Sequence, residues 1–268
     1  MTDSIPGRSG LAGLQVSKMR LLLLAGTAEA RQIARSLAPE PRLSVIASLS
    51  GATRAPEPLG VPTRIGGFGG RDAFRDWLLG EGIDAVLDAT HPFAARISRR
   101  TAEVCLEFGV PYLQLLRPAW TPGPGDRWTF LDSEEDAVRH IPAGAVVFLA
   151  TGRQTLDRFA ELARARTLIC RQIELPQEPF PFPGGQWQVG RPPFTVAEEK
   201  ALFRDLRIEW IVARNAGGSG SRAKLHAARE LGLSVALLRR PSQPEAPRAE
   251  TVAEALSWVR QKLRPAGA

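Results

Sequence analysis

The stretch from Arg20 to Arg31, RLLLLAGTAEAR, constrains the fold of this chain more than any other. Five apolar residues, 21–25, run into a Gly-Thr turn, and a segment rich in Ala, Glu and Arg follows. A continuous apolar run of this kind is typical of a strand buried on both faces of a parallel sheet. The stretch therefore predicts a strand, a tight loop and a helix whose first amides point at an anion, such as a nucleotide phosphate. Gly26 is its only glycine, so the full G-x-G-x-x-G pattern is absent.

The same alternation of apolar run, loop and helical segment continues along the chain, which predicts an α/β fold with parallel sheets. We expect the strands at 21–25, 43–49, 61–65, 83–87, 112–116, 128–131, 145–150, 167–173, 209–213 and 234–238. We expect helices from just after Gly26 to about 37 and at 72–79, 95–108, 133–140, 156–164 and 252–263. Two more are expected, one that begins at a Thr195/Glu198 capping box and one that ends at 231.

The segment Arg117–Gly125 interrupts this alternation with three prolines and two glycines, and we place a domain boundary there. Residues 1–18 are expected to form a disordered leader, residues 19–119 a nucleotide-binding α/β domain, and residues 120–268 a second α/β domain. Two Rossmann-like domains of similar size predict an active site in the cleft between them.

Composition and charge restrict the function. Of the 268 residues, 44% are apolar and 24% charged, and no apolar run is long enough to cross a bilayer, so we expect a cytoplasmic globular protein. The net charge is +7, and residues 204–240 hold eight basic and three acidic side chains. Without a nucleic-acid motif, this charge favours a small polyanion over DNA or RNA as the partner.

The loops that follow the strands carry the expected chemistry, because ligands of open parallel sheets bind beyond the carboxyl ends of the strands. Most of these loops are rich in Gly, Ser or Thr, which let backbone amides approach phosphate closely. The loop after the second strand has no acidic residue before Glu57 and carries Arg54, which favours a ribose phosphate and hence NADP over NAD. The loops are AGTAEAR, SLSGATR, GGFGG and DATHPFA in the first domain, and ATGR and RNAGGSG in the second.

These loops, together with RPAW at 117–120 and AGGSGSRAKLHAARELGL near the end, resemble the precorrin-6A reductase family of cobalamin biosynthesis. The similarity covers roughly residues 19–263 in the same order. The resemblance implies an NADPH-dependent oxidoreductase acting on a CH-CH group. Such an enzyme reduces one double bond of the precorrin-6A macrocycle to give precorrin-6B, and needs neither metal nor flavin. It also implies an NADPH-binding first domain, a substrate-binding second domain and transient contacts with other enzymes of the pathway.

Site residues follow from the loops and from the substrate that the resemblance implies. A precorrin is an apolar ring fringed by carboxylates, so its site needs apolar walls and cations. For the cofactor we expect Gly26, Thr27, Ala28, Glu29, Ser48, Ser50, Gly51, Arg54, Gly67, Phe68, Gly69, Thr90, His91 and Pro92. For the substrate we expect Phe93, Arg117, Trp120, Arg153, Arg214, Asn215, Gly217, Gly218, Ser219 and Lys224, with Phe180, Phe182 and Trp187 on a flap at 176–193.

His91 is the candidate catalytic residue, because the ordinary pKa of histidine suits a proton donor to the carbon next to the hydride acceptor. The competing interpretation is that His91 braces its loop and that water protonates the product. A short-chain dehydrogenase would need a tyrosine followed four residues later by a lysine. The only tyrosine of this chain, Tyr112, has Leu116 at that position, so this class of enzyme is disfavoured. A methyltransferase, a cobalt-precorrin-6A reductase and a non-catalytic NADP- or polyanion-binding module stay open as alternatives.

Overall fold

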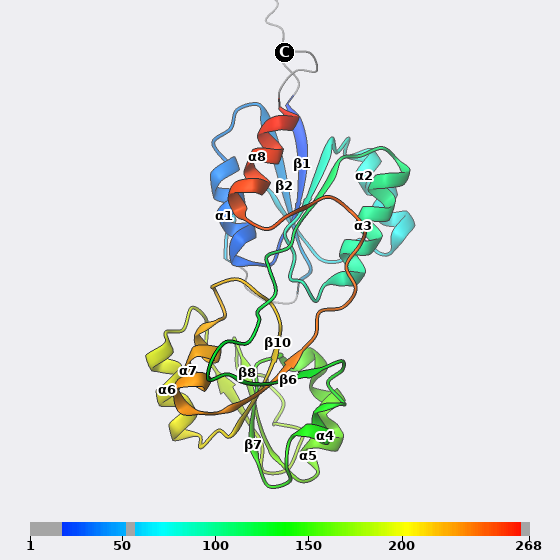
Figure 1. The fold of residues 1–268 in the computed structure, drawn as a ribbon. Coiled ribbons are helices and arrows are strands. Elements are labelled where there is room, and N and C mark those ends of the chain that lie inside the picture. The colour runs from blue at the N-terminus through cyan, green and yellow to red at the C-terminus, as the bar shows by residue number, and fades with distance from the viewer. Residues whose placement is uncertain (1–17, 52–56, 264–268) are drawn as a thin grey trace, which may run out of the picture.

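The computed structural model describes residues 18–51 and 57–263, so the expected leader and Arg54 lie outside the described residues. The chain forms two units, each built on a six-stranded parallel sheet with helices on both faces (Figure 1). This arrangement confirms the predicted α/β fold with two Rossmann-like sheets. No helix among the described residues is long and apolar enough to span a membrane.

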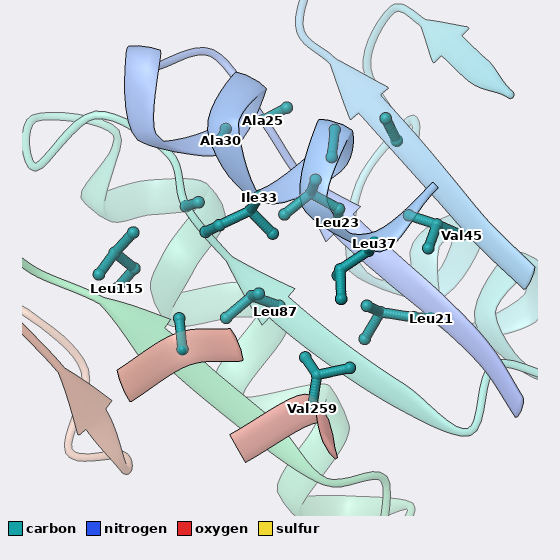
Figure 2. Packing of buried hydrophobic residues seen from close by; sticks show 14 of the residues in the cluster. Leu21, Leu23, Ala25, Ala30, Ile33, Leu37, Val45, Leu87, Leu115 and Val259 are labelled. Atoms are coloured by element: carbon teal, nitrogen blue, oxygen red, sulfur yellow. The ribbon is translucent and has the colours of Figure 1, made fainter. Parts of the chain in front are cut away.

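The first unit has the strand order β12-β5-β4-β1-β2-β3. Alternate residues of β1 face opposite sides of this sheet: Leu21 and Leu23 pack under α1 and α8 (Figure 2), whereas Leu22 and Leu24 pack under α2 and α3. The elements are β1 (Met19–Leu24), α1 (Ala28–Leu37), β2 (Leu43–Leu49), β3 (Thr63–Ile65), α2 (Arg71–Gly80), β4 (Ala85–Asp88), α3 (Ala95–Glu107), β5 (Tyr112–Leu115), β12 (Arg248–Ala249) and α8 (Val252–Lys262).

The second unit has the strand order β6-β11-β10-β7-β8-β9. Its sheet is covered by α4 and α5 on one face and by α6 and α7 on the other. The elements are β6 (Arg127–Leu131), α4 (Ala137–His140), β7 (Val146–Leu149), the 3-10 helix η1 (Arg153–Phe159), α5 (Ala160–Ala163), β8 (Thr167–Gln172), β9 (Gln186–Val189), α6 (Val196–Asp205), β10 (Trp210–Arg214), α7 (Ala223–Leu231) and β11 (Ser234–Leu238).

The two sheets have the same topology. In each sheet a central strand (β1 or β7) comes first and the next two strands (β2 and β3, or β8 and β9) lie on one side of it. The following two strands (β4 and β5, or β10 and β11) lie on the other side. The sixth, outer strand of each sheet comes from a different part of the chain: β6 precedes the other strands of its sheet, and β12 follows β11 of the other unit. Figure 1 shows both connections running between the units.

The division of the chain therefore differs from the predicted 120–268 second domain. β12 pairs with β5, and α8 packs on α1 with Ala255 and Val259 fully buried in the core of the first unit. The helix was predicted correctly, but its apolar face completes the first core, so the chain returns to the first unit after β11.

The expected flap at 176–193 is also partly wrong. Gln186–Val189 forms β9, which pairs with β8 at the edge of the second sheet. Phe180, Phe182 and Trp187 pack against the core of that unit, with the rings of Phe180 and Trp187 centred 4.8 Å apart. These aromatic side chains anchor an edge strand rather than form a flap over the substrate.

Candidate active site

A cavity of about 1130 Å³ lies between the two units, where the carboxyl ends of both sheets face each other. This is the position that the sequence predicted for the active site. The first unit contributes Leu24, Ala25, Gly26, Ser48, Ser50, Gly66, Gly67, Phe68, Thr90, His91, Phe93, Ala94, Arg96 and Ile97. The second unit contributes Asp132, Glu134, Gln154, Thr155, Arg158, Arg214, Leu238, Arg239, Arg240 and Pro241.

The β1–α1 loop brings only part of its expected residues to this cavity. Gly26 lines it, with φ of 133° and no heavy atom within 4 Å of the position that a Cβ would take. Thr27 is buried and caps α1: its Oγ1 accepts from Ala30 N at 3.1 Å and donates to Ala89 O at 2.8 Å. Ala28 begins α1. The Thr27 hydroxyl is thus occupied within the first unit, and the loop offers its backbone to a ligand.

Glu29, expected at the cofactor, instead faces the second unit. Its Oε2 lies 3.0 Å from Nη1 of Arg117, whose Nε also donates to Ala216 O and Gly217 O at 2.9 Å. The Arg117 side chain is only 14% exposed. Arg117, expected among the carboxylate partners of the substrate, therefore joins the two units and is not among the residues that line the cavity.

The loops after β2 and β3 also contribute to the lining of the cavity in the first unit. Ser48, Ser50, Gly67 and Phe68 line it as expected, and Gly66 joins them, whereas Gly51 and Gly69 lie outside.

Arg64, the central residue of β3, was not expected at the site from the sequence. Its guanidinium donates to Ser48 Oγ and Gly66 O at 2.9 Å and to Gly67 O at 3.1 Å, and it stacks 3.7 Å from the Phe68 ring centre. Arg64 thereby fixes the glycine loop against β2.

The loop after β4 is held by a buried carboxylate. Asp88 is fully buried and accepts from Thr90 N, from Thr90 Oγ1 at 2.7 Å and from Tyr112 Oη at 2.8 Å. Thr90, His91 and Phe93 line the cavity, while the carbonyl of buried Pro92 accepts from Gln243 in the second connection. Phe93 also packs against the core of the second unit, so this loop forms part of the junction between the units.

His91 is neutral at physiological pH. Its Nδ1 accepts from Phe93 N at 3.2 Å, which places the ring proton on Nε2. The pKa of His91 is lowered to about 4, mainly by burial and in addition by the like charges of Arg117, Arg214, Arg240 and Lys224. A group with this pKa is almost entirely unprotonated at pH 7, which disfavours the proton-donor role and favours the bracing role.

The second unit presents cations to the cavity, although not the set that was expected. Arg214 lines it with a guanidinium 5.5 Å from the Phe93 ring centre, and its buried Nε has no hydrogen-bond partner among the described residues. Arg158 pairs with Glu134 at 2.5 Å, and Arg239 with Asp132 at 3.1 Å. On the facing side, exposed Arg96 of α3 has no ion pair within the described part of the chain.

Trp120 and the glycine loop after β10, expected at the substrate, are internal. Trp120 is 4% exposed, and its Nε1 donates to Gly218 O at 2.7 Å. Asn215 makes two hydrogen bonds to the backbone of Trp120. A Cβ on Gly217 would lie 2.1 Å from Pro118 O, and one on Gly218 2.4 Å from Arg117 Cδ. These glycines are required by the close approach of the connection between the units.

The remaining expected substrate residues lie outside the cavity between the units. Arg153 and Ser219 are exposed, and Lys224 lines a separate cavity in the second unit. Arg240, which was not anticipated, lines the cavity but donates to four backbone carbonyls, those of Asn215, Ala216, Arg117 and Pro118. No sequence signal separates an arginine that binds carbonyls of its own chain from one that binds a ligand.

Comparison with known proteins agrees with this geometry. The model of the family described as precorrin-6x reductase CbiJ/CobK matches residues 20–260. The chain is 42% identical to a precorrin-6A reductase of Rhodococcus erythropolis, covering 90% of this chain and 97% of that one. It is 29% identical to a cobalt-precorrin-6A reductase of Priestia megaterium, covering 82% of this chain and 90% of that one. A solved structure of CobK precorrin-6A reductase superposes with a TM-score of 0.86 at 40% identity, covering 91% of this chain and 96% of that one. The chain belongs to the precorrin-6x reductase family.

Proposed function

We propose that this protein uses NADPH to reduce one double bond of precorrin-6A, giving precorrin-6B in cobalamin biosynthesis. The observation that carries the proposal is the cavity of about 1130 Å³ that the carboxyl ends of both sheets line together. A nucleotide and a macrocycle must lie in contact for hydride transfer, and a cavity between two ligand-binding sheet edges provides for this. Relatives named precorrin-6A reductase supply the identity of the substrate.

The first unit fits a nicotinamide dinucleotide. Gly26, Gly66 and Gly67 leave open space where other residues would carry a Cβ, and all three line the cavity. Backbone exposed in this way, next to the start of α1, suits a pyrophosphate. The described end of β2, Ser48 to Gly51, has no acidic side chain, which favours the phosphorylated cofactor over NADH. Bound there, the cofactor supplies the hydride.

The protein's own part is to hold the two reactants and to leave a proton accessible. Neutral His91 presents Nε2–H as a hydrogen-bond donor in the cavity and positions the loop after β4. Because burial lowers the pKa of His91 to about 4, water in the cavity is the proton source in this proposal.

The substrate's carboxylates require cations, and of the five described arginines that line the cavity we select three, which differ from most of the expected set. Arg214 lines the cavity from the second unit, Arg96 lines it from α3, and Arg239 borders it with a paired but exposed guanidinium. Guanidinium groups bind carboxylates through paired hydrogen bonds. We assign the substrate's acidic side chains to these three arginines in place of Arg117, Arg153 and Lys224.

Two measurements test the proposal. Titration of the purified protein with NADPH, NADH and S-adenosylmethionine should show at least tenfold tighter binding of NADPH. An anaerobic assay should then show NADPH oxidation that depends on precorrin-6A. Absence of NADPH binding would remove the proposal, binding without oxidation would leave a non-catalytic NADP-binding module, and tight binding of S-adenosylmethionine would favour a methyltransferase.

A second candidate is the reduction of cobalt-precorrin-6A. Relatives with that name share 27–29% of residues with this chain, against 41–42% for those named precorrin-6A reductase, so the metal-free ring is favoured. The same assay with both substrates decides: we expect kcat/KM to be at least tenfold higher for precorrin-6A, and the reverse preference would select the cobalt substrate.

A further inference from the structure

A second cavity of about 260 Å³ lies wholly within the second unit, and none of its lining residues borders the cavity between the units. It lies beyond the carboxyl ends of β7 and β8 and beside the start of α7. Its lining residues are Ala150, Gly152, Arg171, Gln172, Ile173, Gly190, Pro192, Phe194, Glu199, Gly220, Ser221, Ala223 and Lys224.

The position of this cavity repeats that of the proposed cofactor site. β7 occupies the place in its sheet that β1 occupies in the first, and β8, β9 and β10 correspond to β2, β3 and β4. Gly152 follows β7, Arg171 to Ile173 end and follow β8, and Gly190 follows β9. In sheets of this topology, ligands bind at the strand ends where the strand order reverses.

The cavity has one cation in excess. Arg171 and Glu199 form a buried pair with two hydrogen bonds of 2.7 and 2.8 Å, and Glu199 is only 2% exposed. These two charges cancel. The Lys224 ammonium has no carboxylate partner among the described residues and donates to Ser221 O at 2.6 Å. Two of its donor hydrogens therefore stay available.

The start of α7 adds amide donors beside that ammonium. Arg222 precedes the helix, and no side chain caps it. Leu225 N donates to Arg222 O at 2.9 Å, which leaves the amides of Ala223 and Lys224 without an acceptor among the described residues, and together with the helix dipole these two favour an anion. Phe194, which stacks 4.1 Å from the Arg171 guanidinium, and Ile173, 42% exposed, form an apolar wall.

We propose that this cavity is a second binding site, specific for a small organic oxyanion, a phosphate ester or a carboxylate. The charged group of the ligand lies on the Lys224 ammonium and the first amides of α7, and its apolar body lies against Phe194 and Ile173. The site is separate from the one where the cofactor and the macrocycle are proposed to bind.

The titration of Lys224 supports this site. Burial lowers the pKa of Lys224 to about 8; Arg171 adds to the shift, and Glu199 opposes it. A bound anion stabilises the ammonium, so the ligand should raise this pKa, and its affinity should fall as pH rises above about 8.

The four lysines of the chain make Lys224 easy to observe. Reductive methylation with ¹³C-formaldehyde gives each lysine its own NMR signal, assigned with single Lys→Arg variants. We expect phenyl phosphate or 3-phenylpropionate to move the Lys224 signal and to raise its titration midpoint by about one pH unit, which corresponds to tenfold tighter binding to the charged form. The signals of Lys200 and Lys262 should not move. Comparing the two probes shows which oxyanion the site prefers.

Two controls keep the outcome decisive. Calorimetry with phenyl phosphate should show binding to the unmodified protein, to Lys262→Met and to Lys224→Arg, and none to Lys224→Met. Saturating NADP⁺ should leave the Lys224 shift in place, and an NADPH titration of the same sample reads the proposed cofactor site independently. Absence of phenyl phosphate binding to the unmodified protein in calorimetry, or binding that NADP⁺ abolishes, would overturn the proposal.

Discussion

Two glycine-rich regions of this protein look alike in sequence and behave in opposite ways. The loops of the first unit, with Gly26, Gly66 and Gly67, line the cavity and have nothing within 4 Å of the Cβ positions. The loop after β10 has Gly217 and Gly218, whose Cβ positions are taken by Pro118, Arg240 and Arg117. One set of glycines leaves room for a ligand, and the other leaves room for the protein's own chain.

The difference arises from the connections between the units. Arg117 lies in the first connection and Arg240 in the second, and Arg240 donates to Arg117 O at 2.8 Å. Both arginines bind carbonyls of the loop after β10. A glycine position therefore becomes structural where a neighbouring segment fills it, as at Gly217 and Gly218, and keeps its ligand-binding potential where the space around it stays open.

The largest effect expected from this comparison is that of Gly217→Ala. The new Cβ would lie 2.1 Å from Pro118 O on a residue with φ of 68°, so the connection must move. We expect a loss of about 3–5 kcal/mol in the free energy of unfolding, measured with urea. Gly26→Ala is the matched control: strain without a clash should cost about 1–2 kcal/mol, while KM for NADPH rises about tenfold. Equal stability losses in both variants would contradict the distinction.

Arg117→Met tests whether the first connection is held by this guanidinium. The variant leaves Glu29 without its partner and Gly217 O without its donor, whereas Ala216 O keeps Arg240; the loss should cost about 3 kcal/mol. A double-mutant cycle with Glu29→Gln should give a coupling energy of about 1–2 kcal/mol. If the variant were as stable as the unchanged protein but had a raised KM for the tetrapyrrole, Arg117 would be a substrate-binding residue instead.

His91 should make stability depend on pH. Its pKa is about 4 in the folded protein and about 6.5 when unfolded, so the unfolded chain binds a proton that the native state rejects between these values. Stability is therefore complete above pH 6.5 and falls as the pH falls toward 4, with about 2 kcal/mol lost between pH 7.5 and 5. His91→Asn should remove this part of the slope in urea unfolding at the two pH values. An identical slope in the variant would show that the loop after β4 leaves His91 accessible to protons.

The smallest expected effect concerns Arg214. Arg214→Gln removes a guanidinium that lines the cavity, so KM for precorrin-6A should rise about tenfold, or about 1.4 kcal/mol, with KM for NADPH changed less than twofold. Arg153→Gln, an exposed position outside the cavity, should change neither constant more than twofold. An Arg153 variant with the larger effect would reverse the assignment of the substrate's partners.

Much of the fold was predictable from the sequence, because buried parallel strands are continuous apolar runs and their loops are marked by Gly, Ser and Thr. The Thr195 cap is present with both of its hydrogen bonds. The two-residue strand β12 had no pattern to reveal it, and the periodicity of α8 shows that it has an apolar face but not which core that face completes.

The candidate site was predictable in position but not in its charged contacts. Loops at strand ends could be placed at one edge of a sheet, and Gly26, Ser48, Thr90 and His91 do border the cavity. The roles of Arg117 and Trp120 were not predictable, because a guanidinium or an indole N–H donates equally well to a ligand carboxylate and to a carbonyl of its own chain. Only the path of the two connections decides between them.

The exchange of outer strands has a consequence for dividing this protein. A fragment that ends at residue 119 would lack β12, which leaves β5 as an unpaired edge strand. It would also lack α8, which exposes the sheet face against which Ala255 and Val259 are buried, and both changes favour aggregation. The smallest self-sufficient first unit is accordingly a fusion of two distant pieces, 18–115 and 248–262, with the second unit resembling an insertion into it. Any truncated or circularly permuted form must keep β12 and α8 with the first unit and β6 with the second.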